Sequence, residues 1–240
     1  MPPKHEYELA PGQAFSSDIE TVLLIPINET ERIPSYLEKG QEDVLRLIRE
    51  HLQAQGLTVE TLEAEKFQSA VTAARRRARR NSMSLSEDYV RTDMTLSGLI
   101  PGIIENLISS ADLVVVPNMV LRDGEGIGGS VRWDGVRRRV PSTRGGATLS
   151  GTFQAASLRL EIFKASGAKV FGGYGGLDVL WSINYRNSRM ELMDDRMEDE
   201  ANLREGGCVA FYPYFGADKT CRGISLSRNR QDVPVVDKST

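Results

Sequence analysis

Two glycine-rich segments are the first candidates for ligand chemistry. Residues 124–129 (GEGIGG) have the G-x-G-x-x-G spacing of dinucleotide-binding loops, in which the N-terminus of a following helix binds the pyrophosphate. Val131 to Gly135 are strand-like instead, so we interpret residues 124–129 as a flexible loop. Residues 172–176 (GGYGG) lack the Lys-Ser/Thr pair of a P-loop, and they are typical of a bulge or a close backbone approach in a strand.

General-base and metal chemistry have few candidate residues. His5 lies in an N-terminal leader and His51 in a predicted helix, where we expect a surface position. The densest carboxylate cluster is Asp194, Asp195, Glu198, Asp199 and Glu200. It lacks the glycine and the alternating spacing of an EF-hand loop, which favours a solvated acidic helix face. The sequence therefore predicts no catalytic residue, no metal site and no cofactor, and favours a protein that is not an enzyme.

Residues 75–80 (RRRARR) place five arginines in six positions, which no helix can bury on one face. A solvated helix end is the preferred interpretation. Arginine also presents a fork of donors to anions, so a surface for an acidic protein or a lipid headgroup is the second. Nucleic acid ranks lower because aromatic residues that would stack on bases are missing around the run.

Cys208 and Cys221 are separated by twelve residues. A disulfide closing a loop of this size adds about 3 kcal/mol to stability. Two free thiols in a reducing compartment fit the sequence equally well. A zinc site needs about four ligands, and no second cluster supplies the others.

Strands and helices that would position these residues begin near residue 22. Residues 22–27 form a short apolar run, which predicts a strand covered on both faces at the centre of a sheet. Val44, Leu45, Ile48 and Leu52 recur at helical spacing within 40–55, and Gly56 stands where a helix C-terminus is expected. Alternation in 57–62 then completes a right-handed β-α-β unit.

The later segments predict more helices and an antiparallel region. Helices are expected at 63–80, at 96–108 despite Pro101, and at 189–205, where Met190, Met193, Met197 and Ala201 form a narrow stripe. Strands are expected at 111–117, in 131–140 with one face toward water, and in a hairpin over 158–171. Residues 209–215 are aromatic enough to dock on the fold.

Composition indicates one domain without a strong global field. The 240 residues are 40% hydrophobic, and 30 basic against 33 acidic residues give a net charge of -3. No stretch approaches the roughly 18 apolar residues of a membrane span. We predict an extended leader over 1–20, a single α/β domain with a mixed sheet over 21–215, an arginine-rich helical insertion at 63–95, and a flexible tail over 216–240.

The order of elements resembles the superfamily of the TolB N-terminal domain and the curli-secretion lipoprotein CsgG. The resemblance spans roughly residues 20–215. It rests on the opening strand at 22–28, the helix through Leu52, the segment 111–118 (ADLVVVPN), and the hairpin 157–171 followed by 172–177.

This resemblance implies a non-enzymatic, periplasmic lipoprotein associated with the outer membrane. Such a protein binds protein partners in envelope assembly, transport or secretion, including copies of itself, and binds no nucleic acid. No acylatable cysteine lies near Met1, so we expect a signal peptide and an anchor cysteine to have been removed. An oxidising periplasm would favour a Cys208–Cys221 disulfide, and Trp133 with residues 212–215 would be candidate anchors for partners.

A second hypothesis is a small-molecule or nucleotide-binding enzyme, for which the expected location is the cytoplasm. Its site would lie at the C-terminal ends of the central strands, near Asn28, Asn118 and the segment 122–130.

Overall fold

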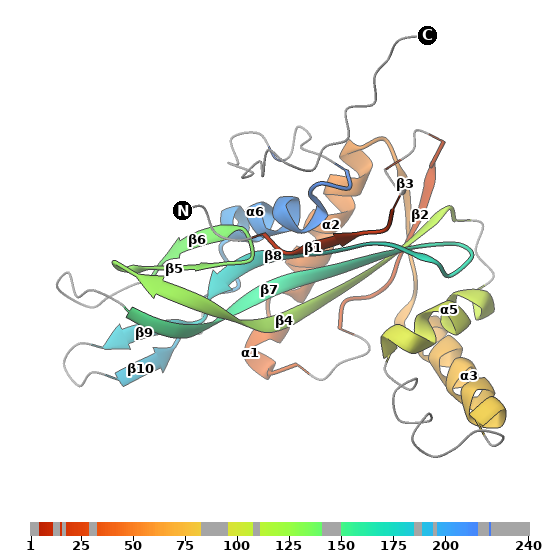
Figure 1. Cartoon of the computed structure of the whole chain (residues 1–240), viewed down its shortest axis with the longest axis horizontal. Coiled ribbons are helices and arrows are strands. Elements are labelled where there is room, and N and C mark those ends of the chain that lie inside the picture. Colours follow the sequence, from red (N-terminus) through yellow and green to blue (C-terminus); the bar gives the residue numbers. More distant parts are fainter. Residues whose placement is uncertain are drawn as a thin grey trace, which may run out of the picture.

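A computed structural model describes residues 5–11, 15, 18–28, 33–82, 96–107, 111–140, 150–184, 189–193, 196–215 and 221. It has an eight-stranded mixed sheet, in which six strands follow the order β1-β8-β7-β4-β2-β3 (Figure 1). The other two are β5, which pairs with β4, and β6, which pairs with β5. Helices pack on the sheet, so the α/β prediction is confirmed. The predicted tail lies outside the described residues apart from Cys221.

The opening β-α-β unit is confirmed. Strand β2 (Thr21–Leu24) pairs in parallel with β3 (Thr58–Thr61), and α2 (Gln41–Ala54) connects them after the short α1 (Ser35–Glu38). Gly56 follows α2 with φ +87°, a backbone conformation that glycine adopts without strain. The central position predicted for β2 is wrong, since β2 lies next to the edge strand β3.

Two long strands form the centre of the sheet instead. Strand β4 (Leu113–Ile127) pairs antiparallel with β7 (Ser150–Lys164) along its whole length, and β7 pairs with β8 (Lys169–Val179). The predicted hairpin over 158–171 is confirmed, and β7 begins well before it. At the start of β4, the Asp112 carboxylate accepts hydrogen bonds from the Thr21 backbone N–H and hydroxyl, each at 2.9 Å, and this ties β4 to β2.

The β-prone region after β4 is a tight hairpin. Strands β5 (Ser130–Trp133) and β6 (Val136–Arg139) are joined by Asp134 and Gly135, both with positive φ, as two-residue hairpin turns require. Val136 is buried and Arg137 is exposed, which confirms the prediction of one solvated face. In Figure 1 the hairpin folds back over β8, and the Gly176 N–H donates to the Asp134 carbonyl at 3.1 Å.

Part of the predicted leader belongs to the fold. Tyr7–Leu9 form the edge strand β1, which pairs antiparallel with Phe171–Gly173 of β8. The leader lacks apolar periodicity because a three-residue edge strand needs backbone partners rather than a buried face. The expectation that the fold begins only after residue 20 is therefore wrong.

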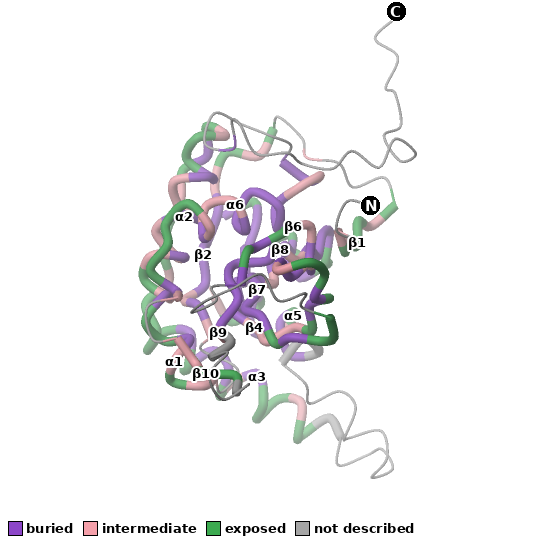
Figure 2. Tube along the Cα trace, turned by 90° about the vertical axis from the view of Figure 1, so that its left-hand side faces the viewer, coloured by how far each residue is buried: buried purple, intermediate pink, exposed green. Residues whose placement is uncertain are grey.

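Helices cover both faces of the sheet. Helix α2 and α6 (Glu200–Phe211) pack on one face around Leu24, Leu158 and Phe211. Helices α3 (Ala64–Ser82) and α5 (Leu96–Asn106) pack on the other face in a separate cluster with Phe67, Ile103 and Val114. Figure 2 shows β4, β7 and β8 as buried purple segments and much of α3 as exposed green. Within the described residues, no helix is long and apolar enough to cross a bilayer.

The predicted methionine-striped helix over 189–205 is wrong. Arg189–Leu192 form β10, which pairs with β9 (Trp181–Asn184), and α6 begins only at Glu200. Met190 is 45% exposed whereas Met197 is buried, so the methionines share no face. Helical spacing alone could not reveal the β9 partner, and the Asp199 carboxylate, which accepts from the Ala201 and Asn202 N–H groups, fixes the true helix start.

Asp199→Ala should lower the free energy of unfolding by about 1 kcal/mol, because two backbone donors of α6 lose their acceptor. Asp199→Asn keeps a side-chain oxygen and should stay within about 0.3 kcal/mol of the wild type. Urea unfolding of both variants measures the difference. Equal destabilisation by the two substitutions would show that the cap is not the cause.

Candidate functional site

The segment 124–129 is not the flexible loop that the sequence predicted. Gly124 belongs to β4 and pairs with β7, and Glu125, Gly126 and Ile127 pair with both β5 and β7. Gly128 and Gly129 have φ +57° and +81° and turn the chain into β5. A strand follows rather than a helix, in agreement with the interpretation that rejected a dinucleotide site.

The glycines of 172–176 allow a helix to lie directly on the sheet. A Cβ at Gly173 or Gly175 would overlap a backbone carbonyl oxygen of α6, that of Ala210 or Gly206 respectively. The β7–β8 register also shifts beside Gly176. The predicted close approach and bulge are both present, so packing accounts for this segment.

His51 lies in the interior rather than on the helix surface, and it is only 4% exposed. It follows Leu47 and Ile48 at the spacing of the buried face of α2. Its ring stacks on Phe211 with centroids 4.6 Å apart, and its Nδ1 lies 3.6 Å from Cys221 Sγ. The structure joins Cys221 to Cys208 in a disulfide next to this ring.

The aromatic residues considered as partner anchors belong largely to the core. Trp133, Tyr214 and Phe215 are 5%, 6% and 8% exposed. Trp133 Nε1 donates to the Ser157 hydroxyl at 3.0 Å, which anchors the β5–β6 hairpin. Tyr212, the fourth of these aromatic residues, is half-buried. The anchor prediction is wrong for the buried residues because aromatic character does not distinguish core packing from docking.

Asn28, which was proposed for a ligand site at the strand ends, binds the backbone of β4 instead. The Asn28 side chain accepts from the Met119 N–H at 2.8 Å and donates to the Met119 carbonyl at 2.9 Å. Asn28 has φ 54°, a left-handed conformation that asparagine tolerates. Asn118 is buried in β4. The Asn28 amide therefore fastens the loop after β2 to β4.

The predicted acidic cluster is divided among several roles. Asp194 and Asp195 lie outside the described residues. Asp199 caps α6, and Glu200 contacts Arg204 at 2.8 Å and Arg46 at 3.5 Å. The hydrogen bond from Arg204, with the charge of Arg46, lowers the pKa of the Glu200 carboxyl. Glu200 therefore serves in an ion-pair network between α2 and α6.

A charged network that the sequence did not indicate lies on the sheet beside β1. Arg122 Nε contacts the Asp134 carboxylate at 3.2 Å, its guanidinium also pairs with Glu6, and it lies 4.5 Å from the Tyr174 ring centroid. Lys169 contacts Glu8 and Glu161 in the same way. Glu8 lies in β1 and Glu6 directly precedes it, so these ion pairs tie β1 to the sheet.

His5 belongs to the same region and gives a pH-dependent prediction. Burial lowers the pKa of His5, while the charge of Asp134 partly opposes the effect. Unfolded histidine titrates near pH 6.5, so the unfolded state takes up the proton first as pH falls. The stability that comes from keeping His5 neutral is therefore fully present above about pH 6.5. It is lost as the pH falls through the pKa of His5 in the folded state. Between about pH 7.5 and 5, urea unfolding should show a smaller loss of unfolding free energy in His5→Gln than in the wild type. Equal losses in the two proteins would contradict this role of His5.

Helix α3 carries the arginine run on an arm beside the sheet. Its apolar side packs Phe67, Val71 and Ala74 against α5. All five arginines of 75–80 are exposed, as the sequence predicted, and they lie toward the end of α3 that runs away from the sheet in Figure 1. Arg77 contacts Glu105 of α5 at 2.6 Å. Within the described residues, Arg75, Arg76 and Arg80 form no ion pair.

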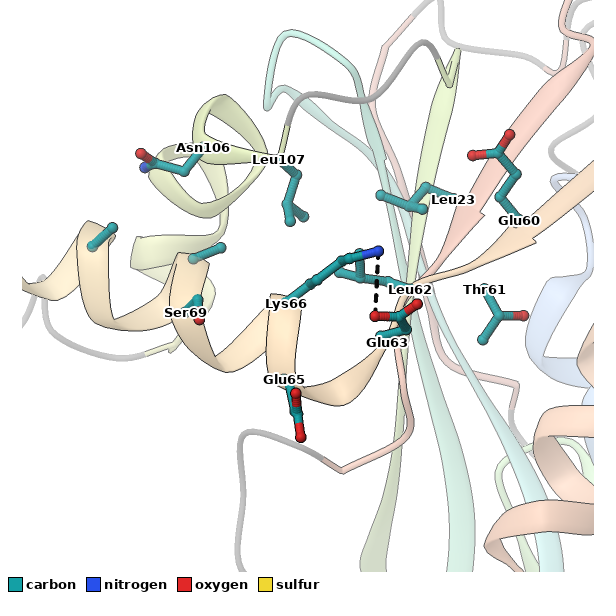
Figure 3. Close-up of a pocket in the computed structure, with 12 residues that line it drawn as sticks. Leu23, Glu60, Thr61, Leu62, Glu63, Glu65, Lys66, Ser69, Asn106 and Leu107 are labelled. Atoms are coloured by element: carbon teal, nitrogen blue, oxygen red, sulfur yellow. Dashed lines mark ion pairs between the residues drawn. The ribbon is translucent and has the colours of Figure 1, made fainter.

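A groove of about 840 Å³ lies at the base of this arm, between α3, α5 and the end of β3 (Figure 3). Leu23, Leu62 and Leu107 give it an apolar part. Exposed carboxylates gather around it at Glu60, Glu63 and Glu65, and Lys66 neutralises Glu63 at 3.2 Å. The arm is therefore acidic at its base and basic at its far end.

Comparison with known proteins assigns this chain to no family. No protein-family model matches the chain, and no curated protein matches it. Among solved structures, a PelC variant from Paraburkholderia phytofirmans, described as a dodecamer, aligns with 88% of this chain and 99% of its own. The aligned residues are 12% identical and the TM-score is 0.38, which is too low to carry an argument about this chain.

Proposed function

We propose that this chain is a non-enzymatic protein of the bacterial cell envelope that binds an acidic protein partner through residues 75–80, the arginine-rich end of α3. The observation that carries the proposal is the concentration of five exposed arginines within residues 75–80, at the far end of a helix whose other side is already packed. This arrangement exposes cations where the fold itself does not use most of them.

The partner group that we propose for these arginines is a protein carboxylate. A guanidinium binds a carboxylate through two parallel hydrogen bonds, and exposed charges of one sign accelerate encounter with the opposite sign. A lipid surface could be held by charge alone, because α3 packs on α5 the apolar face that insertion into a bilayer needs. Nucleic acid is disfavoured by the lack of aromatic residues beside the run.

Two further observations support the cell-envelope location. A buried disulfide is common in proteins of oxidising compartments and rare in the cytosol, and Cys208 and Cys221 are both buried. The resemblance to the TolB and CsgG superfamily points the same way and would add a lipid anchor at the outer membrane. We accordingly propose that the chain is a periplasmic lipoprotein of an assembly, transport or secretion system.

The contacts of two polar side chains, Asn28 and His51, support a non-enzymatic role. Asn28 is engaged by Met119, and His51 is packed against Phe211 and the disulfide. These groups hold elements together, whereas the catalysis of the rival hypothesis needs such groups to face a substrate.

Photocrosslinking in the native organism tests the proposal. A crosslinking amino acid at position 76 or 80 should join the chain to one acidic protein, whereas the same residue at position 137 or 139 should not. Arg75→Glu combined with Arg76→Glu should weaken that complex about tenfold or more. Arg137→Glu combined with Arg139→Glu is the matched control, because these two arginines are also exposed and the charge change is equal.

Three results would overturn the assignment of this surface. The first is equal crosslinking from β6 and α3, and the second is a complex that survives the α3 charge reversal unchanged. The third is an adduct with lipid or nucleic acid in place of protein.

A further inference from the structure

The buried group of His51, Cys208 and Cys221 combines three side chains that ligate transition metals. Their ligand atoms all lie within 4.8 Å of one another, and all three residues are buried. They come from three places, α2, α6 and a segment beyond α6, so the group exists only in the folded chain. Sequence spacing alone, with its twelve-residue gap between cysteines, did not suggest a site.

The group could bind a metal ion only with its two cysteines reduced. In a tetrahedral zinc site, the zinc–sulfur bond is about 2.3 Å long and the bond to imidazole nitrogen is about 2.05 Å. With these bond lengths, a nitrogen and a sulfur ligand lie about 3.6 Å apart, and two sulfur ligands lie about 3.8 Å apart. His51 Nδ1 and Cys221 Sγ are 3.6 Å apart. Cys208 and Cys221 are joined in a disulfide, so their sulfurs cannot both bind an ion until that bond is reduced.

The surroundings of the group hold the imidazole in place. The His51 ring stacks on Phe211 with an interplanar angle of 18°, and Phe215 lies edge-on at 6.3 Å between centroids. Two aromatic contacts restrict rotation of the ring and keep Nδ1 directed at Cys221. A metal ligand is most effective when its neighbours fix its orientation in this way.

We propose that reduction of the Cys208–Cys221 disulfide converts this group into a zinc site. A dithiol reductant gives up two electrons and two protons, its own sulfurs join in a disulfide, and Cys208 and Cys221 become thiols. Zinc then binds both thiolates and His51 Nδ1, and two protons leave to solvent. Two thiolates with Zn²⁺ and neutral imidazole carry no net charge, which suits a buried site, and water fills the fourth position.

Cobalt binding to the whole chain tests this proposal, because Co²⁺ replaces Zn²⁺ and its absorption spectrum reports thiolate ligation. Protein is reduced with a dithiol, freed of it without oxygen, and titrated with Co²⁺ and then Zn²⁺. Reduced wild type should bind one ion per chain with thiolate-to-cobalt charge-transfer absorption, and Zn²⁺ should displace it. Oxidised wild type should bind none at the same concentrations.

Matched variants identify the ligands. His51→Gln and Cys208→Ser should each weaken binding by the reduced protein about a hundredfold, whereas His5→Gln, which changes the other histidine of the chain, should leave it unchanged. Circular dichroism establishes that each variant is folded, and the oxidised wild type supplies a comparison without any substitution.

Two results would overturn the zinc site. One is a reduced wild type that binds Co²⁺ no better than the oxidised protein. The other is a His51→Gln variant with wild-type affinity, in which case His51 only packs against the sulfurs. Neither result bears on the arginine surface of α3, which is tested in the oxidised protein.

Discussion

Gly206→Ala should lower the free energy of unfolding by about 3 kcal/mol, whereas Gly207→Ala, one residue further along α6, should raise it by up to about 1 kcal/mol. A Cβ at Gly206 would lie 2.6 Å from the Gly176 carbonyl oxygen and 2.8 Å from Leu177 Cδ2. The carbonyl belongs to the backbone of β8 and cannot move aside without disturbing the sheet. A Cβ at Gly207 meets nothing within 4 Å, so only the better helix propensity of alanine remains.

Chemical denaturation of the two variants measures this contrast, and their opposite signs exclude a general effect of alanine in α6. Gly175→Ala should reproduce the loss from the strand side, because its Cβ would overlap the Gly206 carbonyl. Similar stabilities for Gly206→Ala and Gly207→Ala would show that α6 does not lie as close to β8 as described.

Removal of the disulfide should have an effect of similar size. Cys208 and Cys221 are 13 residues apart in sequence, and opening a loop of that length releases chain entropy in the unfolded state worth about 3 kcal/mol. Cys208→Ala combined with Cys221→Ala should therefore lower the free energy of unfolding by about 3 kcal/mol. The bond attaches Cys221 to the end of α6, so the packing around His51 should also loosen.

Urea unfolding with and without a dithiol reductant measures the contribution of the disulfide. In metal-free buffer, reduction should destabilise the wild type and leave the double alanine variant unchanged. A wild type that is equally stable in both conditions would mean that the bond constrains no part of the cooperative fold.

Elements whose signal is local could be predicted from the sequence. The periodic apolar face of α2, the continuous apolar runs of β2 and β4, and the alternation near residue 160 each determine an element without help from distant residues. The solvated arginines of α3 were predictable for the same reason, since five adjacent cations cannot share one buried face.

Features that depend on a distant partner could not be predicted. Strand β1 exists because β8 offers a free edge, and β10 exists because β9 lies opposite it. His51 is buried because α6 and Cys221 cover that side of α2. Trp133 and Tyr214 are aromatic residue types that are common at protein interfaces, but both are buried in the core. Only the tertiary structure shows whether such a residue is buried or exposed.

The pairing of β1 with β8 has a consequence for the order of folding. Tyr7 pairs with Gly173, and the strand that contains Gly173 also receives α6 from the C-terminal part of the chain. The sheet therefore cannot close on its N-terminal edge until most of the polypeptide has emerged from the ribosome. Non-local pairing of this kind slows folding.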